Sequence, residues 1–392
     1  MPSCLIPIYQ KLPVTLTRGE GVWLYDDQGR QYLDALSGIG VCALGHNHPA
    51  ITKTITEQAA RLLQVSNAFH TPWQTALANK LCGLSGLAAA YFSNSGTEAN
   101  EAVIKMALKY GTSHGIATPK IIVMEGGYHG RSLGAWSASC DHSTSQFGPL
   151  MPCFIRVPFN DINAINAIKD PNVIAIMLEP VFGKGGLRPA SLDYIHALRE
   201  YCDQHHCLLI LDEIQSGMGR TGKLFAYQHT KILPDMLTTA KTLGNGIPIG
   251  AYLCNHKVAK VIKPGDHGST QGGNPFACAV ALTVLETFEK EHLYTHVTDI
   301  GHYLQQALRE ALRTYPVFDN IQGKGLMIGI KLKHPIPNIV AMGLEQGIIF
   351  NLAGETVIRL LPPYIITQAH ADLIVERLSK TLGMSQNGLH YL

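Results

Sequence analysis

Five short, continuous runs of apolar residues constrain the fold of this 392-residue chain more than any other feature of its sequence. The runs are residues 90–93, 120–124, 173–178, 207–211 and 236–239, and segments with helical spacing separate them. Strands that are apolar along their whole length are typical of a parallel sheet buried on both faces. The alternation of such strands with helices predicts an α/β fold around a mostly parallel central sheet.

The two ends of the chain have a different pattern. Residues 21–33 alternate between apolar and polar side chains around a glycine turn, as an antiparallel hairpin does. A long amphipathic stretch follows residue 280, and residues 371–382 repeat apolar side chains at helical spacing. We therefore expect residues 46–280 to form a large domain, and residues 1–45 and 281–392 to form a smaller α+β domain together.

The composition excludes several classes of protein. Hydrophobic residues make up 46% of the chain and charged residues 15%, which is typical of a globular enzyme with much of its chain buried. The net charge of +2 gives no basic footprint for nucleic acid, and no apolar run approaches the roughly 18 residues that cross a bilayer. Nine cysteines without a Cys-x-x-Cys motif, and no basic and apolar leader, favour a reducing compartment. We expect a cytoplasmic protein that binds neither nucleic acid nor membrane.

Lys241 is the only charged residue between Asp235 and His256, and its neighbours in the sequence are apolar or small. Desolvation penalises the charged form of such a lysine, so its pKa falls and its neutral amine can attack a carbonyl to form a Schiff base. The alternative is a lysine at the end of a strand with its ammonium group in water. The local sequence leaves both interpretations open.

Residues 91–101 run from a strand into a helix through Ser95, Gly96 and Thr97. The free amides at the start of that helix, together with the nearby hydroxyls, can cradle a phosphate group. Ser95 and Glu98 also have capping-box spacing, which requires no ligand. Both interpretations fit this segment.

Asp212 directly follows the apolar run 207–211, at the edge where open α/β sheets bind their ligands. A carboxylate there can keep a heteroaromatic nitrogen protonated, which turns the ring into an electron sink. A turn or helix cap is the alternative role. The segment 217–224 is close to a loop that binds nucleoside triphosphates, but Leu224 stands where that loop needs serine or threonine, so we reject this function.

An anion site, an acid at a strand end and a sequestered lysine are the three groups that pyridoxal phosphate requires. The chain also strongly resembles the class III aminotransferases, which are pyridoxal-phosphate enzymes of fold type I, over nearly its whole length. The motifs that carry the resemblance are residues 94–101, 126–131, 212–222, 265–270 and 272–275. It implies a large domain with a mostly parallel sheet of seven strands, a smaller α+β domain, and pyridoxal phosphate as the cofactor.

By this resemblance Lys241 forms the Schiff base with the cofactor and later moves a proton between substrate and cofactor, while Asp212 pairs with the ring nitrogen. The other implied cofactor contacts are Ser95, Gly96 and Thr97 at the phosphate, Tyr128 on the ring face and Gln215 near the ring hydroxyl. Thr270 resembles a residue that reaches the phosphate of the neighbouring subunit, which implies a homodimer. No metal site is implied.

Within the class, residues 37–41, 44–49, 65–67 and 325–329 most resemble the acetylornithine aminotransferases. The implied reaction moves the distal amine of N-acetylornithine to 2-oxoglutarate, a step of arginine biosynthesis that gives N-acetylglutamate semialdehyde and glutamate. The alternatives are an ornithine or 4-aminobutyrate aminotransferase, and a regulatory protein that keeps the fold without catalysis.

The same resemblance implies three substrate contacts. Arg131 matches a clamp for the α-carboxylate of the acyl-ornithine, and Arg359 matches the arginine that binds the α-carboxylate of glutamate. A planar guanidinium suits a carboxylate better than an ammonium group does. Ser269 is a further expected substrate contact.

The sequence departs from the family pattern within residues 179–184. Phe182 stands where the family has a glutamine, and Lys184 stands where it has a glutamate. The second change reverses a charge near the expected site. We expect these changes to affect substrate preference more than transamination, because the cofactor-holding residues are kept.

Some polar residues fall outside the predicted site. Cys42 lies in a glycine-bounded loop that the resemblance places near substrate, and a packing role is favoured over a nucleophilic one. We interpret four histidines as surface or loop residues, because no further ligands fall at zinc spacing; they are His46, His48, His205 and His206.

Overall fold

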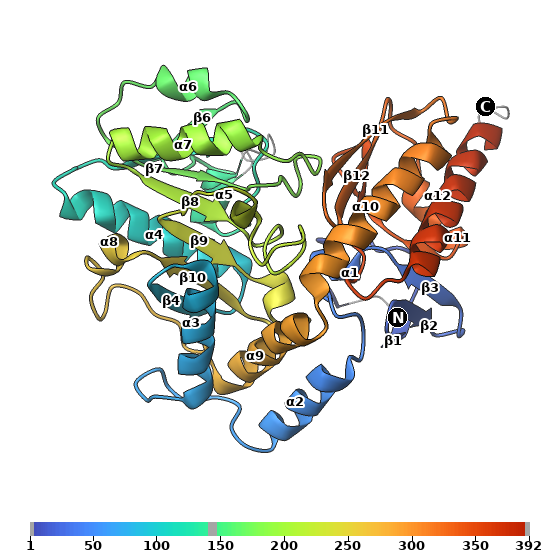
Figure 1. Cartoon of the computed structure of the whole chain (residues 1–392), viewed down its shortest axis with the longest axis horizontal. Coiled ribbons are helices and arrows are strands. Elements are labelled where there is room, and N and C mark those ends of the chain that lie inside the picture. Colours follow the sequence, from blue (N-terminus) through green and yellow to red (C-terminus); the bar gives the residue numbers. More distant parts are fainter. Residues whose placement is uncertain (1–3, 140–146, 389–392) are drawn as a thin grey trace.

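The computed structural model describes residues 4–139 and 147–388, so residues 1–3 and 389–392 of the expected smaller domain lie outside it. Figure 1 shows two groups of elements, one on each side of the view. The larger group holds the central sheet and the helices from α2 to α9. The smaller group holds the first three strands together with α10, α11 and α12. Within the described residues, no helix is long and apolar enough to cross a membrane.

The central sheet has seven strands in the order β4-β10-β9-β8-β7-β5-β6. Its strands are β4 (Ala89–Ser93), β5 (Lys120–Met124), β6 (Phe154–Val157), β7 (Val173–Leu178), β8 (Leu208–Asp212), β9 (Met236–Thr239) and β10 (Gly250–Cys254). The pairs from β9 to β6 are parallel, whereas β10 is antiparallel to both β4 and β9. The predicted α/β sheet is confirmed, and every apolar run belongs to one of its strands.

Side chains on both faces of this sheet are buried, which explains why its strands are continuously apolar. In β8, Leu208 and Ile210 pack into one apolar cluster with α4 (Gly96–Ser113). Leu209 and Leu211 pack into a second cluster with α7 (Leu192–Gln204) on the opposite face. All four side chains are fully buried, and burial of each stabilises the fold by roughly 1.5–3 kcal/mol. The remaining helices of the larger group are α2 (Pro49–Ala59), α3 (Pro72–Ser85), α5 (Leu133–Ala138), α6 (Ile162–Asn166), α8 (His256–Ala259) and α9 (Pro275–Lys290).

Two four-stranded sheets lie in the smaller group. The first contains β1 (Leu16–Glu20), β2 (Trp23–Asp26), β3 (Gln31–Asp34) and β13 (Ile348–Ile349), and the second contains β11 (Phe318–Lys324), β12 (Met327–Leu332), β15 (Val357–Leu360) and β14 (Asn351–Ala353). Because β3 pairs in parallel with β13, the N-terminal hairpin shares a sheet with a C-terminal strand. The division of the chain at residues 45 and 280 stays a prediction.

The C-terminal helices are α10 (Leu293–Leu312), α11 (Ile339–Glu345) and α12 (Gln368–Gly388). The amphipathic stretch that follows residue 280 is broken, because α9 ends at Lys290 and His292 adopts a left-handed conformation, with φ of 52°, before α10 begins. The predicted final helix is confirmed: its periodic apolar residues are fully buried on α12, and they are Ala371, Ile374, Leu378 and Leu382.

Candidate active site

The predicted cofactor residues come from different strands but meet at one edge of the central sheet. Asp212 ends β8, Lys241 follows β9, and Gly96 begins α4 directly after β4. Glu179 follows β7, and Tyr128 lies in the loop after β5. Ligand sites of open α/β sheets lie at this carboxyl edge. The fold therefore brings together residues that are far apart in the sequence.

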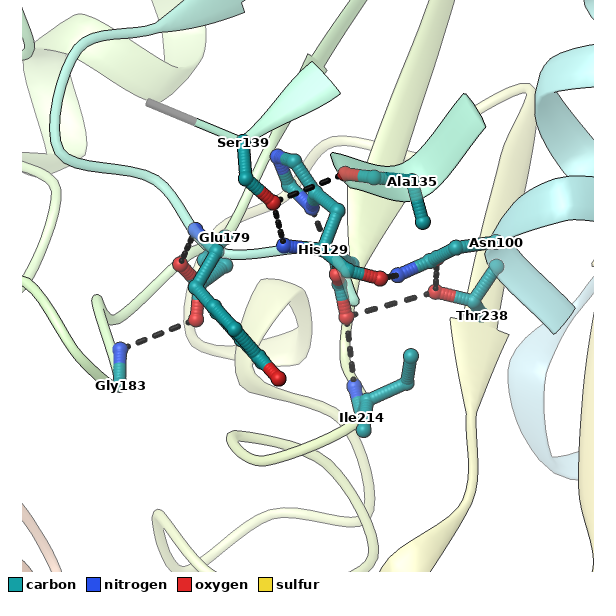
Figure 2. A network of polar contacts seen from close by, with 10 residues as sticks. Asn100, His129, Ala135, Ser139, Glu179, Gly183, Ile214 and Thr238 are labelled. Atoms are coloured by element: carbon teal, nitrogen blue, oxygen red, sulfur yellow. Dashed lines mark hydrogen bonds and ion pairs between the residues drawn. The ribbon is translucent and has the colours of Figure 1, made fainter. Parts of the chain in front are cut away.

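The carboxylate of Asp212 is the centre of a buried hydrogen-bond network, part of which Figure 2 shows. Its Oδ2 accepts from Asn100 Nδ2 at 2.8 Å and lies 2.7 Å from His129 Nδ1. Its Oδ1 accepts from the backbone amide of Ile214 at 3.1 Å and from Thr238 Oγ1 at 3.4 Å. The residue is only 3% exposed. Hydrogen bonds of this kind replace the water that a buried carboxyl group loses, so Asp212 is fixed in position.

His129 is the histidine partner of this carboxyl group. Burial acts to lower the pKa of His129, but the hydrogen bond and the charge of Asp212 outweigh it and raise this pKa above its ordinary value. The backbone amide of His129 donates to Ser139 Oγ at 2.8 Å, and Ser139 in turn donates to the carbonyl of Ala135 (Figure 2). His129 thus orients and balances Asp212.

Sequence reasoning missed this role of His129 and Asn100. Both residues lie within motifs that carry the family resemblance, but a hydrogen bond across the sheet edge has no local signature. Which side chain reaches Asp212 depends on how the strands are arranged in the folded chain, and the local sequence does not show this arrangement.

Lys241 begins a single turn of 3-10 helix, Lys241–Leu243, and its own φ is 48°. The residue is partly buried, and desolvation lowers the pKa of its amine to about 8. This pKa already includes the charges of Asp212 and Glu179, which act to raise it, and the charge of Arg359, which acts to lower it. The structure therefore favours the sequestered lysine over one with its ammonium group in water.

The start of α4 has the helix cap that the sequence left open as an alternative to a phosphate site. Ser95 caps the helix, because its side chain accepts from the amide of Glu98 at 3.3 Å. Thr97 Oγ1 lies 2.8 Å from Ser132 Oγ. A Cβ on Gly130, which has φ of 139°, would lie 2.2 Å from Thr97 Oγ1, so the loop after β5 is packed tightly over the first turn of α4. The cap and an anion site are compatible here, because the cap occupies only one amide of the first turn.

Gln215 and Glu179 both lie beside Gly183, where an added Cβ would be 2.6 Å from Gln215 Oε1 and 3.2 Å from Glu179 Oε2. Glu179 is buried, and its two carboxylate oxygens accept from the amides of Tyr128 and Gly183, both at 2.9 Å. Burial, followed by the charge of Asp212, raises the pKa of Glu179 to about 7. Gln215 is 8% exposed, and within the described residues its Oε1 has no hydrogen-bond partner. A buried acceptor without a partner is what a ligand hydroxyl can satisfy.

Arg359 reaches the site from the smaller group of elements. It lies on β15, is 9% exposed, and donates through Nε to Asn351 Oδ1 at 2.9 Å. Burial lowers the pKa of its guanidinium to about 10, although the nearby charge of Glu179 acts to raise it. Arg359 stays cationic near neutral pH, and a buried guanidinium group of this kind suits a carboxylate.

Three predicted residues lie further from this cluster. Arg131 is exposed, with its guanidinium carbon 5.6 Å from the ring centroid of Trp136. Ser269 Oγ accepts from Asn94 Nδ2 at 3.2 Å, next to the start of α4. Thr270 is exposed on the same turn, and its carbonyl accepts from Gln64 Nε2 at 2.5 Å.

Comparison with known proteins supplies the family. The sequence pattern of the family described as Aminotransferase class-III matches residues 7–382. The acetylornithine aminotransferase of Nitrosomonas europaea is 46% identical over 380 residues, which cover 96% of this chain and 97% of that protein.

Solved structures agree with this match. The ornithine aminotransferase of Toxoplasma gondii has a TM-score of 0.94 at 32% identity, and the alignment covers 98% of this chain and 94% of that one. The N-acetylornithine aminotransferase of Stenotrophomonas maltophilia has a TM-score of 0.85 at 35% identity, with 96% and 97% covered. Sequence, fold and site geometry lead to one conclusion: the chain belongs to the class-III aminotransferases.

Proposed function

We propose that this chain transfers the distal amine of N-acetylornithine to 2-oxoglutarate, giving N-acetylglutamate semialdehyde and glutamate in arginine biosynthesis. The observation that carries the proposal is the 46% identity to an acetylornithine aminotransferase over nearly the full length of both chains. An ornithine aminotransferase is the second candidate, because such an enzyme has a fold that matches this chain with a TM-score of 0.94. Its lower identity, 32%, favours the first candidate.

The residues at the sheet edge fit pyridoxal phosphate, the cofactor of this family. The first amides of α4 and the hydroxyl of Thr97 suit a phosphate. Gln215 Oε1, which has no hydrogen-bond partner among the described residues, suits the ring hydroxyl, and the hydrogen-bonded carboxyl group of Asp212 suits a protonated ring nitrogen. Lys241 is an amine whose pKa is lowered by burial. Each of these groups is buried or half-buried, and each matches one part of the cofactor.

The residues of the chain have separate roles in the reaction. When bound, pyridoxal phosphate supplies a carbonyl that takes up an amine and a ring that accepts an electron pair from the substrate. Asp212 holds the proton at the ring nitrogen, and His129 keeps Asp212 in place. The amine of Lys241 takes the proton from the substrate carbon that bears the amine. In the second half-reaction it gives a proton to the corresponding carbon of the 2-oxo acid.

We assign the substrate residues by the same reasoning. Arg359 holds the α-carboxylate of glutamate and 2-oxoglutarate, because it is a buried cation that faces the site. Arg131 and Ser269 hold the α-carboxylate end of the acyl-ornithine nearer to the surface. The exposed turn at Thr270 suits a contact with the phosphate in a partner subunit, so we propose a homodimer with shared sites. We also place the enzyme in the cytoplasm.

A panel of amino donors tests this function. With 2-oxoglutarate as acceptor, N-acetylornithine should give the highest kcat/KM, well above ornithine and 4-aminobutyrate. The variant Lys241→Ala should bind cofactor and remain folded but lose turnover, because no other amine replaces the proton transfer. Formation of glutamate is the measurement. Preference for ornithine would support the second candidate, and appreciable turnover by Lys241→Ala would contradict the role of Lys241.

The pKa of Lys241 gives a prediction for the cofactor-free protein. Because only the neutral amine attacks a carbonyl, the rate of covalent attachment of pyridoxal phosphate should rise with pH to a midpoint near 8. An exposed lysine, with a pKa near the ordinary 10.5, would have its midpoint more than two pH units higher. The absorbance change of the cofactor measures this rate, and Lys241→Ala is the control that should not react. A midpoint close to 10.5 would mean that burial does not tune this amine.

Lys184 gives a prediction for substrate preference. Its Nζ lies 5.8 Å from the ring centroid of Tyr128, and the amide of Tyr128 donates to Glu179, whose charge acts on Arg359. A cation here adds to the positive charge of Arg359, which favours anionic substrates and disfavours a donor with an extra ammonium group, such as ornithine. Lys184 is exposed, so the effect of Lys184→Glu should be moderate. We expect the KM for 2-oxoglutarate and the ratio of ornithine to acetylornithine turnover each to rise roughly two- to fivefold at low salt.

A matched charge reversal controls for the general effect of net charge. Lys169 is also exposed, but it follows α6 in the outer part of the larger group, and Lys169→Glu should leave both quantities unchanged. If Lys184→Glu leaves both quantities at their wild-type values, Lys184 does not influence the substrate.

A further inference from the structure

Side-chain amides hold the turn at residues 269–273, which precedes α9 and carries Thr270. These residues belong to no helix or strand, so the turn depends on other contacts for its shape. Asn67 Nδ2 donates to the carbonyls of Ser269 and Gly272, both at 3.0 Å. An amide nitrogen of asparagine carries two hydrogens, and here both are used to join the two sides of the turn.

Gln74, on α3, completes this network from a regular element. Its Nε2 donates to Asn67 Oδ1 at 2.8 Å, which orients the amide of Asn67, and to the carbonyl of Gly273 at 3.1 Å. A Cβ on Gly273, which has φ of 76°, would collide with Gln74 Nε2, so the close approach requires glycine. Gln74 therefore fixes the turn twice, once directly and once through Asn67.

The network lies beside a surface that is typical of a subunit contact. Thr270 is exposed, and its carbonyl accepts from Gln64 Nε2 at 2.5 Å. Leu63 and Phe69 belong to the same segment between α2 and α3 as Gln64 and Asn67, and they are 54% and 65% exposed. Large apolar side chains that gather on a surface mark a site of interaction with another protein. The amides thus connect α3 to the subunit contact proposed for Thr270.

We infer that Gln74 is a positioning residue for the active site of the partner subunit. Through Asn67 and Gly273 it holds Thr270 where the threonine hydroxyl reaches the phosphate group of pyridoxal phosphate in the partner. The inference rests on the shared-site homodimer of the proposed function. A contact of this kind needs its group held within about 0.5 Å of the productive position. Because Thr270 lies on a turn, the amides supply that precision.

Gln74→Met tests this role, because methionine has a similar length but donates no hydrogen bond. We expect the dissociation constant of pyridoxal phosphate to rise about fivefold or more, as after the loss of one hydrogen bond. The dissociation constant of pyridoxal, which lacks the phosphate group, should stay unchanged. The absorbance of the bound cofactor measures both constants without turnover. Asn67→Ala should have the same selective effect.

A matched variant separates this role from a general loss of stability. Gln228 Nε2 also donates to a backbone carbonyl, that of Leu84 at 2.9 Å, but at the other end of α3. Gln228→Met should leave both dissociation constants unchanged. In a Thr270→Ala background, Gln74→Met should weaken the binding of pyridoxal phosphate no further, because both changes remove the same contact. Equal weakening of pyridoxal and pyridoxal phosphate by Gln74→Met would overturn the inference.

Hybrid dimers show which subunit each residue serves. If one chain carries Lys241→Ala, the cofactor attaches covalently only to the other chain, and its absorbance follows its loss. Gln74→Met should speed this loss when it is on the Lys241→Ala chain, and it should have no effect on the chain that keeps Lys241. The reverse pattern would overturn the inference.

Thr270→Ala in the same hybrids tests the shared site separately. If Thr270→Ala acts across the interface and Gln74→Met does not, only the role of Gln74 is wrong. If Thr270→Ala has no effect across the interface, the shared site of the proposed function is wrong as well.

Discussion

The buried carboxylate of Asp212 is the constraint on which the rest of the active site depends. A carboxylate that is 3% exposed is costly unless hydrogen bonds and an opposite charge compensate for the lost water. Asn100 on α4, His129 after β5 and Thr238 on β9 supply that compensation for an acid at the end of β8. Four separate elements must therefore converge at this edge. That convergence also sets the positions of the first turn of α4 and of Lys241.

A second constraint joins the two groups of elements. Arg220 is fully buried, and its Nη1 donates to the carbonyls of Leu326 and Pro362 at 3.3 and 2.5 Å. Its guanidinium lies 4.4 Å from the ring centroid of Tyr364. Pro362 and Tyr364 follow β15, the strand that carries Arg359, and Leu326 precedes β12, which pairs with β15. Arg359 is thus tied to the larger group through a buried cation, which explains how a residue from the smaller group reaches the site.

The sequence predicted the parts of this structure that depend on local pattern. Continuous apolar runs identified the parallel strands, and the position of Asp212 after one of them placed it at the ligand-binding edge. The roles of Glu179 and His129 depend on contacts between distant elements, so no local pattern revealed them. The strands β6 and β10 were also missed; β6 is only half-buried, and β10 lies close to a glycine-rich turn.

Phe182 illustrates the same limit. The sequence has Phe182 where the family has a glutamine, and the ring is fully buried and stacks on Phe159, with centroids 3.9 Å apart. Arg188 lies over both rings, 5.6 and 5.4 Å from their centroids. Phe182 is therefore a packing residue beneath the loop that holds Glu179. Of the two departures from the family, Lys184 alone presents a charge toward the ring of Tyr128.

The most direct test of this account is the single-turnover rate of Asp212→Asn with N-acetylornithine. Asparagine keeps the shape of the side chain but loses the charge, so cofactor binding should weaken and the rate should fall by about a hundredfold or more. Asp235→Asn is a matched control, because Asp235 is also buried and pairs with Arg199 at 2.8 Å, away from the carboxyl edge. It should lower stability without changing the single-turnover rate. A rate near wild type in Asp212→Asn with cofactor bound would contradict the account.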